Sequence, residues 1–584
     1  MNVAYLSRNR SLVVGRFDRL AWVLIGIPIV CFSLLLFAYI VDVPWMDDID
    51  AFLSFIVGYI DAPTVERKIY WLLSPNNEHR ILTGKLLTLL CYNLTGAVNF
   101  RWLIFAAFAF LLVLLAIFYR VFRLTGLPIL AFVPIPFLLL QPQYYLTTTW
   151  AITSLQHQVV VAMVIAVIYL LADGSRSRFG IGLILQVLTS FSMSNGLFGW
   201  VAGAVVLVMQ RQWVRLGIWL AVGGGAIVYY FHDFPNTQGN DSSVSFFLEH
   251  PHLIFLGFFT FNGGLFDFLP ETSILVRSIL PTLAGLILIP AMLWLLWQMA
   301  EPILRRPVRA SANLDRATAA LWKRRYFLTG CYAFLMVNAV VVAFLRPRFG
   351  YAVMLISNYM IYPALLVVLL YLNVLSEQYK NSRVLETWVR AGLVVGFVVW
   401  GAWYVFRLPK IPFRKEQLLT SAFNQKYNET GLGPSWGHPF VSLARRSLDQ
   451  AVQRGLYQYP TDAYYSAYEQ ILLTKGRSMK PDTSLTLHRS GGGYSYLVET
   501  DYGVLPKPVG QSAVVVQSDQ RTYLFASSVH FSPANFYLNR PIQTVFAEVI
   551  IPMLPPGTYR LGILTTSDEA TTPIRFSPQT ITIP

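Results

Sequence analysis

The segment LAWVLIGIPIVCFSLLLFAYIV at residues 20–41 decides the fold class, because it contains no charged side chain. A helix needs about 20 apolar residues to cross the hydrocarbon core of a bilayer, which is about 30 Å thick. This segment reaches that length and is predicted to span a membrane. It is too long for the apolar core of a signal peptide, and no small-residue cleavage site follows it. We therefore expect it to be retained as the first membrane helix.

The whole chain shares this apolar character. Of its 584 residues, 55% are hydrophobic and 13% are charged, whereas about 25% of the residues of a soluble domain are charged. The net charge is +15, but the basic residues lie at the ends of apolar runs and form no single patch, so nucleic acid is not an expected partner. The spacing of Cys31, Cys91 and Cys331 suggests neither a metal cluster nor a disulfide framework.

Further apolar runs predict a polytopic α-helical membrane protein with about eleven transmembrane helices. The expected spans lie at 20–41, 102–119, 127–144, 158–172, 180–194, 197–210, 216–231, 280–299, 326–345, 353–375 and 390–406. Spans three to seven have the least certain boundaries, because several are short and joined by tight turns.

The distribution of Lys and Arg predicts the orientation of these spans. Basic residues crowd the connections at 300–325 and 376–390, whereas the connections at 145–157 and 192–196 contain none. Because basic loops stay in the cytoplasm, the N-terminus is expected there and the C-terminus outside. The predicted domains are a transmembrane domain at 1–406 with an outside loop at 42–101, a helical connector at 407–475, and an outside β-sandwich-like domain at 476–584.

The evidence for the β domain is alternation of apolar and polar residues, with turn residues between the alternating runs. This pattern is typical of the short strands of a sandwich. The expected strands lie at 484–488, 494–499, 512–517, 522–527, 545–551, 559–565 and 574–583.

The outside loop contains three carboxylates directly after the first span. Asp47, Asp48 and Asp50 follow Trp45, and a carboxylate at the membrane surface is able to deprotonate a hydroxyl nucleophile. The alternative is a solvated helix cap, since Asp is favoured near helix N-termini. The same oxygen atoms suit a divalent cation, but no metal or other cofactor is predicted.

A second group in the same loop is Asn77-Glu78-His79-Arg80, which precedes an apolar stretch at 81–98. This stretch contains Lys85 and Asn93 and resembles a helix lying along the membrane surface more than a span. Arg and His at its start are suited to binding a phosphate group. The alternative is a capping cluster at a helix start.

Two further groups are expected on the outer side. Arg346 and Arg348 lie between the ninth and tenth spans, where an arginine either holds an anionic lipid head group or extends to bulk lipid. The segment from Gln141 through Trp150 to Gln156 and His157 mixes polar and aromatic residues that suit a sugar. Aromatic residues also populate membrane interfaces without any catalytic role.

In this order and on one membrane side, the motifs resemble the GT-C superfamily of integral membrane glycosyltransferases, and most closely a set of bacterial GT-C-like membrane proteins. The resemblance covers roughly residues 20–375. It rests on WMDDID at 45–50, NEHR at 77–80, the Ser194-Asn195-Gly196 turn, and RPRFG at 346–350 followed by Ser357-Asn358-Tyr359. Asn358 stands where the resemblance leads us to expect an arginine, so Arg346 or Arg348 would supply that phosphate contact.

The resemblance implies an inverting hexosyl- or pentosyltransferase in the bacterial inner membrane. It would move a sugar from undecaprenyl phosphate to a cell-envelope glycan, such as O-antigen or lipopolysaccharide, on the periplasmic side. Asp47 or Asp48 would be the base, and the phosphate would bind His79, Arg80, Arg346 and Arg348. Other substrate contacts would come from Asp50, Glu78, Trp150, Gln156, His157, Asn195 and Tyr359. The alternatives are a transporter or flippase, or a non-catalytic assembly protein, for a lipid-linked glycan.

Overall fold

The computed structural model describes the chain as two compact units. The described residues are 10–583, except 78, 235–240, 271, 306–314, 378–381, 409, 434–440, 462–468, 474–484, 490–493, 502–511, 530–543 and 566–573. Unit 1 consists of Met1–Ala38, Leu72–Leu86 and Ile104–Tyr404. Unit 2 consists of Tyr39–Trp71, Leu87–Leu103 and Val405–Pro584. The unit boundary passes through the first loop, so the loop is shared between the two.

Unit 1 is built from helices, several of them interrupted by 3-10 turns or, at η4, by a π-helical turn. The elements are α2 (Arg10–Tyr39), α6 (Phe100–Arg123), η2 (Ile129–Phe132), α7 (Pro134–Leu139), η3 (Pro142–Tyr144), α8 (Tyr145–Thr149), α9 (Ala151–Thr153), η4 (Ser154–Gln158), α10 (Val159–Leu171), α11 (Arg176–Ser190), η5 (Ser194–Leu197), α12 (Phe198–Met209), α13 (Trp213–Phe231), α14 (Asp241–Glu249), α15 (Pro251–Asn262), η6 (Gly264–Phe266), α16 (Ile274–Arg305), α17 (Arg316–Leu345), η7 (Pro347–Phe349), η8 (Tyr351–Leu355), η9 (Ser357–Tyr359), α18 (Ile361–Glu377) and α19 (Ser382–Arg407).

Within the described residues, nine helices are long and apolar enough to cross a membrane, or ten if α14 and α15 form one broken span. The chain is therefore polytopic and helical, with fewer candidate spans than the eleven expected. The expected spans at 180–194 and 197–210 correspond to α11 and α12, which are shorter than the other candidates. No span was expected at 232–279, but this region contains α14 and α15, bent by 103° at His250 and Pro251. Its apolar run was too short to be recognised as a span.

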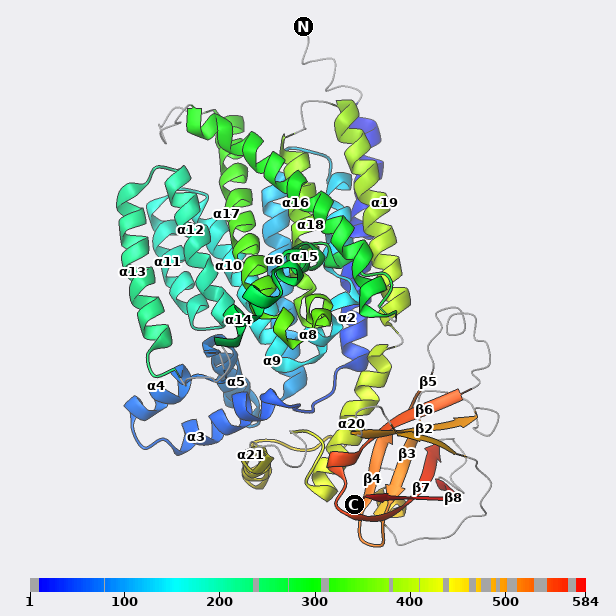
Figure 1. The fold of residues 1–584 in the computed structure, drawn as a ribbon. Helices are drawn as coiled ribbons and strands as arrows, with labels where there is room; N and C mark the ends of the chain where they lie inside the picture. The colour runs from blue at the N-terminus through cyan, green and yellow to red at the C-terminus, as the bar shows by residue number, and fades with distance from the viewer. Residues whose placement is uncertain are drawn as a thin grey trace. The chain divides into compact units, whose positions relative to one another are not determined.

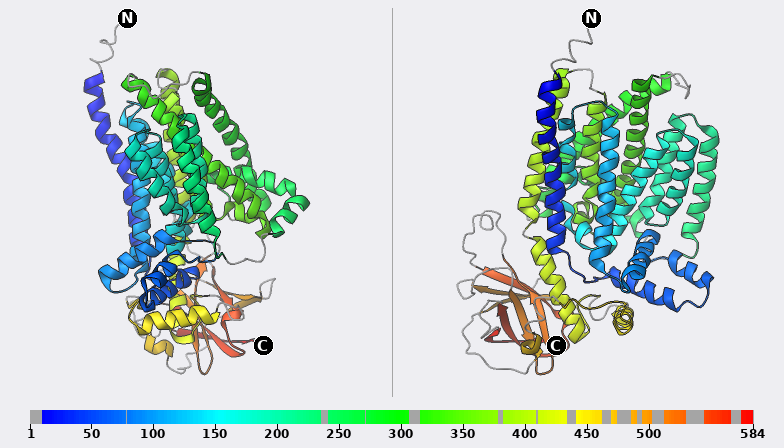
Figure 2. Two further views of the ribbon diagram at one scale, coloured as in Figure 1. Left: turned by 90° about the vertical axis from the view of Figure 1, so that its left-hand side faces the viewer. Right: turned by 180° about the vertical axis from the view of Figure 1, so that it is seen from behind.

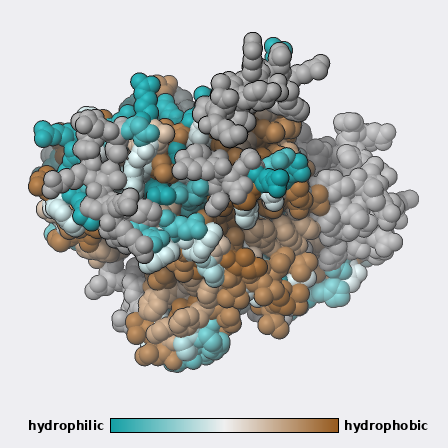
Figure 3. Space-filling model, turned by 90° about the horizontal axis from the view of Figure 1, so that it is seen from above, coloured by the Kyte–Doolittle hydropathy of each residue, from teal (hydrophilic) through white to brown (hydrophobic). Residues whose placement is uncertain are grey.

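Helices α10, α11, α12, α13 and α17 pack side by side (Figures 1 and 2). Glycines allow the close contact between α12 and α13: a Cβ atom on Gly203 would lie 2.2 Å from the Trp219 ring, and one on Gly223 would lie 2.9 Å from the Trp200 ring. Outward-facing side chains of α13 and α16 are apolar, Val214 and Ile287 among them. Figure 3, a view from above, shows hydrophobic residues over much of the coloured surface. Apolar outward faces are expected of helices that face lipid.

Unit 2 combines part of the first loop with the C-terminal region. Its helical elements are η1 (a π-helix, Ile49–Ser54), α3 (Phe55–Asp61), α20 (Lys410–Asn428), α21 (Val441–Gln453) and α22 (Glu469–Leu473), while α4 (Val65–Leu73) and α5 (Leu82–Thr95) each cross the unit boundary. Helix α5 confirms that the stretch at 81–98 is helical. Its position on a membrane surface stays a prediction.

The C-terminal strands form two antiparallel sheets of four strands each, with strand orders β1-β2-β6-β5 and β4-β3-β7-β8. The strands are β1 (Thr486–Arg489), β2 (Ser495–Asp501), β3 (Ser512–Gln517), β4 (Thr522–Ala526), β5 (Ser528–Val529), β6 (Thr544–Ile550), β7 (Gly557–Thr565) and β8 (Ile574–Ile583). Both sheets contribute to one apolar core, for example Val498 and Val549 from the first and Val516 and Leu561 from the second. All seven strands expected from the alternation are present.

Helix α20 covers strand β4, which lies at the edge of its sheet. The Asn424 side chain donates to the Leu524 carbonyl at 2.7 Å and accepts from the Leu524 N–H at 2.8 Å. One turn later, the Asn428 side chain donates to the Thr522 carbonyl at 2.7 Å. Two amides spaced by one helical turn thus pair with alternate residues of an edge strand, which blocks pairing with another chain.

Candidate functional site

A buried polar cluster in unit 1 centres on the Tyr362 hydroxyl at the start of α18. Asn195 in η5 donates to this hydroxyl through Nδ2, and Nδ1 of His157 in η4 lies 3.0 Å from it. The His157 ring contacts the Tyr359 ring edge-on, with 5.7 Å between centroids. Phe261 packs against Tyr362 on another side. Three segments that are distant in sequence therefore meet at one phenol.

His79 belongs to the same neighbourhood. A tight turn at Asn77, whose φ is 48°, lets the Asn76 and His79 backbones pair with each other. Burial, together with the charge of Arg346, lowers the pKa of His79 to about 4, so the imidazole is neutral at neutral pH. Its Nδ1 atom is buried and has no hydrogen-bond partner in the described part of the chain. Arg346 and His79 also interact electrostatically with His157, so the three side chains lie within electrostatic range of one another.

Arg346 follows the last residue of α17 and is half-buried. Among the described residues, its side chain makes no hydrogen bond and no ion pair. A guanidinium that is partly removed from water usually has a carboxylate or carbonyl partner, since burying an uncompensated charge is costly. This arrangement leaves Arg346 able to accept an anionic ligand.

Arg80, which was also expected to bind phosphate, is engaged by backbone carbonyls. Its Nε donates to the Tyr230 carbonyl at 2.8 Å, and its Nη2 donates to the carbonyls of His232 at 2.5 Å and Tyr229 at 3.4 Å. Its Nη1 donates to the Leu73 carbonyl. These carbonyls end α13 and α4, where a helix leaves carbonyls without internal partners. Arg80 therefore caps the C-terminal ends of helices in this structure, whereas the capping alternative considered for the motif was a cluster at a helix start.

The other residues expected on this side have more ordinary environments. The Arg348 guanidinium carbon lies 4.6 Å from the centre of the Phe349 ring, a cation–π contact. Trp150 is half-buried at the break between α8 and α9, and Gln156 is buried within η4. Glu78 lies outside the described residues.

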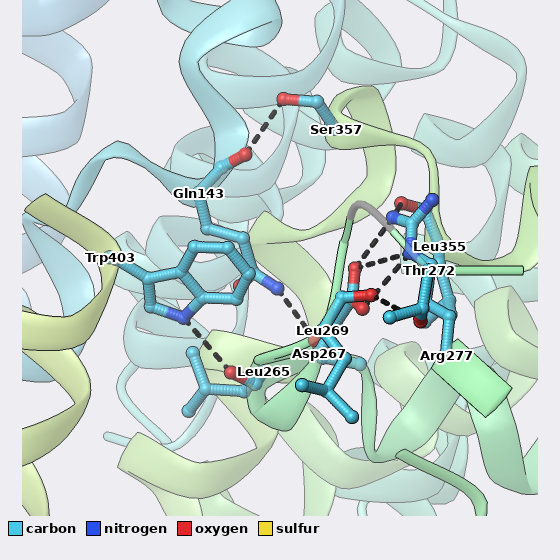
Figure 4. A network of polar contacts seen from close by, with 10 residues as sticks. Gln143, Leu265, Asp267, Leu269, Thr272, Arg277, Leu355, Ser357 and Trp403 are labelled. Atoms are coloured by element: carbon cyan, nitrogen blue, oxygen red, sulfur yellow. Dashed lines mark hydrogen bonds and ion pairs between the residues drawn. The ribbon is translucent and has the colours of Figure 1, made fainter. Parts of the chain in front are cut away.

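A polar network fixes the segments around this cluster (Figure 4). The Gln143 side chain donates to the Gly264 carbonyl at 2.6 Å, and Ser357 donates to the Gln143 carbonyl at 2.8 Å. The Trp403 indole donates to the Leu265 carbonyl at 3.0 Å. Because these bonds join four segments of unit 1, they hold the turn after α15 against the turn before α18.

An ion pair strengthens the same junction (Figure 4). Arg277 in α16 binds both carboxylate oxygens of Asp267, at 2.6 to 3.0 Å, and donates to the Leu355 carbonyl at 2.9 Å. The Asp267 side chain is 1% exposed. A bidentate pair of this kind fixes direction as well as distance, so it orients the loop that leads to Tyr359.

The three carboxylates of the first loop lie in unit 2. Asp48 is 2% exposed, and its Oδ2 accepts from the Trp45 N–H at 3.1 Å. This bond closes the turn before η1, so Asp48 takes part in a local structural contact. Asp47 and Asp50 are exposed. Of the two residues expected to act as base, Asp47 is therefore the one accessible to a water-borne acceptor.

The C-terminal connector holds this segment in place. The Met46 N–H donates to the Leu432 carbonyl at 2.6 Å, and the Arg414 guanidinium carbon lies 3.7 Å from the centre of the Trp45 ring. Farther along, Ser54 donates to Ser447 at 2.7 Å. From the sequence we predicted a connector at 407–475 that is separate from the loop at 42–101. In the structure the connector and part of this loop belong to the same unit.

The structure thus brings His79, Arg346, His157, Asn195 and Tyr359 together in unit 1, and Asp47, Asp48 and Asp50 together in unit 2. Within the described ranges, no group of three or more His, Cys, Asp or Glu side chains is arranged to hold a metal ion. The sequence analysis missed Tyr362, because a tyrosine in the apolar run after 360 resembles ordinary helix core. The only available signal was its position three residues after Tyr359.

Comparison with known proteins assigns no role to these residues. No protein-family model, no curated protein and no solved structure matches the chain.

Proposed function

We propose that the chain is an inverting glycosyltransferase of the GT-C kind, acting at the periplasmic face of a bacterial inner membrane. It transfers a sugar from undecaprenyl phosphate to a cell-envelope glycan, with O-antigen or lipopolysaccharide as the first acceptor to test. One observation carries the proposal. Arg346, a half-buried cation without an ion-pair partner among the described residues, lies within electrostatic range of His79, whose buried Nδ1 has no hydrogen-bond partner among them.

The chemistry of these two groups favours a phosphate ester. A guanidinium matches phosphate oxygens with two parallel N–H donors, and a neutral imidazole gains a proton when an anion comes near. Arg346 stands at the end of an apolar helix of 30 residues. A phosphate with a long hydrocarbon tail matches both the charge and the apolar surroundings.

The reaction balances with this chain's own residues. An acceptor hydroxyl gives its proton to Asp47, or to Asp48 in the alternative assignment, and its oxygen forms a bond to the anomeric carbon. The bond from that carbon to the phosphate oxygen breaks with its electron pair. Arg346 then stabilises the additional negative charge on the departing polyprenyl phosphate. Attack from the face opposite the phosphate inverts the anomeric configuration.

Transfer by the purified full chain in nanodiscs tests the proposal. The assay would offer undecaprenyl-phosphate hexoses and pentoses with a glycan acceptor and measure labelled product. The Asp47→Asn variant should lose about a hundredfold or more in rate. Asp519→Asn, which changes an exposed carboxylate on the turn between β3 and β4, is the control and should keep full activity. Full activity in both Asp47→Asn and Asp48→Asn would overturn the base assignment, and absence of transfer from every donor would overturn the enzyme function.

The bend between α14 and α15 favours a second candidate, a flippase for a lipid-linked glycan. Broken helices are typical of carriers that alternate access across the bilayer, and this pair is bent by 103°. In vesicles with the labelled lipid in one leaflet, a flippase would move the label to the other leaflet without an acceptor. Transfer of sugar to an acceptor without movement of the lipid would exclude this candidate.

A further inference from the structure

The hydrogen bonds around Tyr362 have a defined direction. The Asn195 Nδ2 group only donates, so the Tyr362 oxygen accepts from it. The phenol proton then has one acceptor among the bonds that the described residues make, which is Nδ1 of His157 at 3.0 Å. With the phenol as donor, a neutral His157 has its own proton on Nε2, because a neutral imidazole protonates one nitrogen only.

This direction leaves one acceptor and one donor for a ligand. The Asn195 side chain uses its amide nitrogen for Tyr362, and its Oδ1 is buried with no partner in the described part of the chain. Asn195 is only 4% exposed. On the other side of the phenol, the His157 Nε2–H makes no hydrogen bond to a described residue. Tyr362 thus orients an acceptor and a donor at the same time.

A hydroxyl group fits this pair, and a phosphate does not. A hydroxyl donates one hydrogen bond and accepts another, whereas a phosphate dianion has no proton to give to Asn195 Oδ1. Because Oδ1 is already removed from water, a hydroxyl that reaches it makes a bond without a desolvation cost on the protein side. A site built to bond a hydroxyl discriminates strongly against an analogue that lacks it.

We propose that Tyr362 is a positioning residue through which Asn195 and His157 recognise a sugar hydroxyl on the donor lipid, next to the phosphate held by Arg346 and His79. This inference rests on the proposed function, since it assigns the sugar of the same lipid. Its consequence is selectivity: the site prefers a polyprenyl-phosphate sugar to the bare polyprenyl phosphate.

The test compares two affinities in one protein. Binding of undecaprenyl phosphate and of a panel of undecaprenyl-phosphate hexoses and pentoses would be measured on the purified full chain in nanodiscs. For the preferred sugar, the wild type should bind the sugar lipid about tenfold more tightly than the bare lipid. Tyr362→Phe should reduce this ratio to about one and leave the affinity for the bare lipid unchanged.

A matched control is available in the neighbouring helix α17. Asn373 donates to the Tyr332 hydroxyl at 3.3 Å, so Tyr332→Phe removes a buried phenol of the same kind, and it should leave the ratio unchanged. Asn195→Ala is the second variant in case Tyr362→Phe fails to fold, because it also removes the unpartnered Oδ1. It should abolish the preference too.

The outcomes separate the inference from the proposed function. If the wild type binds neither lipid, the proposed function is wrong, and the inference falls with it. If the wild type binds both lipids equally, or if Tyr362→Phe and Asn195→Ala retain the preference, the inference is wrong while the phosphate site stands. Loss of the preference in Tyr332→Phe would also overturn it, since the effect would then be structural.

Discussion

The basic residues at the two ends of helix α17 differ in whether they form ion pairs. Near its start, Lys323 pairs with Asp173 at 2.7 Å, and Arg325 pairs with Glu377 at 2.6 Å. Just after its last residue, Arg346 has no such partner among the described residues. Cations of the first kind join helices to one another, and a cation of the second kind is available to an anion from outside. The position of a cation in the sequence does not reveal which kind it is.

The largest expected loss of stability comes from breaking the ion pair between Arg325 and Glu377. Arg325→Gln leaves the Glu377 carboxylate, 9% exposed, without its partner, and breaking a buried ion pair costs about 4 kcal/mol. Thermal unfolding in detergent should show a large drop in stability, most of which Arg325→Gln combined with Glu377→Gln recovers. The control is Arg390→Gln, which breaks an exposed pair with Glu386 and should change stability by about 0.5 kcal/mol or less. Equal effects of Arg325→Gln and Arg390→Gln would contradict the structural role.

The next effect concerns Arg80. Arg80→Gln leaves carbonyls at the end of α13 without donors, and several buried acceptors left unpaired cost about 3 kcal/mol together. The unfolding temperature should fall. The unfolding temperature of Arg80→Lys should fall less, because lysine retains a donor but lacks the paired N–H donors of the guanidinium. If Arg80→Gln instead kept the wild-type unfolding temperature and lost lipid binding, Arg80 would return to the phosphate-binding role first expected for it.

His79 predicts a pH dependence. Its pKa of about 4 in the folded chain lies below the ordinary value of about 6.5, so the unfolded chain takes up the proton first as the pH falls. Stability is therefore lost as the pH falls through the window between these values, by about 2 kcal/mol from about pH 7 to about pH 5. His79→Gln should remove this loss, as measured by unfolding at both pH values. The control, exposed His488→Gln, should retain it, and identical pH profiles for wild type and His79→Gln would refute the prediction.

The smallest free-energy change should come from Arg346, although its functional consequence is the most direct. Arg346→Gln removes no side-chain hydrogen bond and no ion pair among the described residues, so stability should remain at the wild-type level. Affinity for undecaprenyl phosphate should fall about tenfold, the effect of one charge-assisted hydrogen bond of about 1.5 kcal/mol. Binding in nanodiscs measures this, with Arg390→Gln as the charge-matched control. A large loss of stability with unchanged affinity for undecaprenyl phosphate would mean that Arg346 joins helices, as Lys323 and Arg325 do.

Part of the fold was predictable because the signal was local. Strands β3 and β8 begin and end at the residues where the alternation begins and ends. Most of the candidate membrane spans follow their apolar runs for the same reason. The bent pair α14–α15 was missed because neither helix alone has the length of a span.

Only part of the membership of the candidate site was predictable. His157, Asn195 and Tyr359 were expected as substrate contacts, and they lie together with His79 and Arg346. The hub of the cluster, Tyr362, was not recognised, because a buried tyrosine with two polar partners has the same local sequence as one packed in a core.

The sequence by itself determined the apolar helices, the strands and the segments that carry polar residues, since periodicity and composition act over a few neighbouring residues. Only the tertiary structure decided which polar groups acquire partners. Arg80 meets the carbonyl of a residue 150 positions away, and His157 meets a hydroxyl 205 positions away. The difference between a capping arginine and Arg346 therefore arises from long-range packing, because a hydrogen bond depends on distance in space and not on distance along the chain.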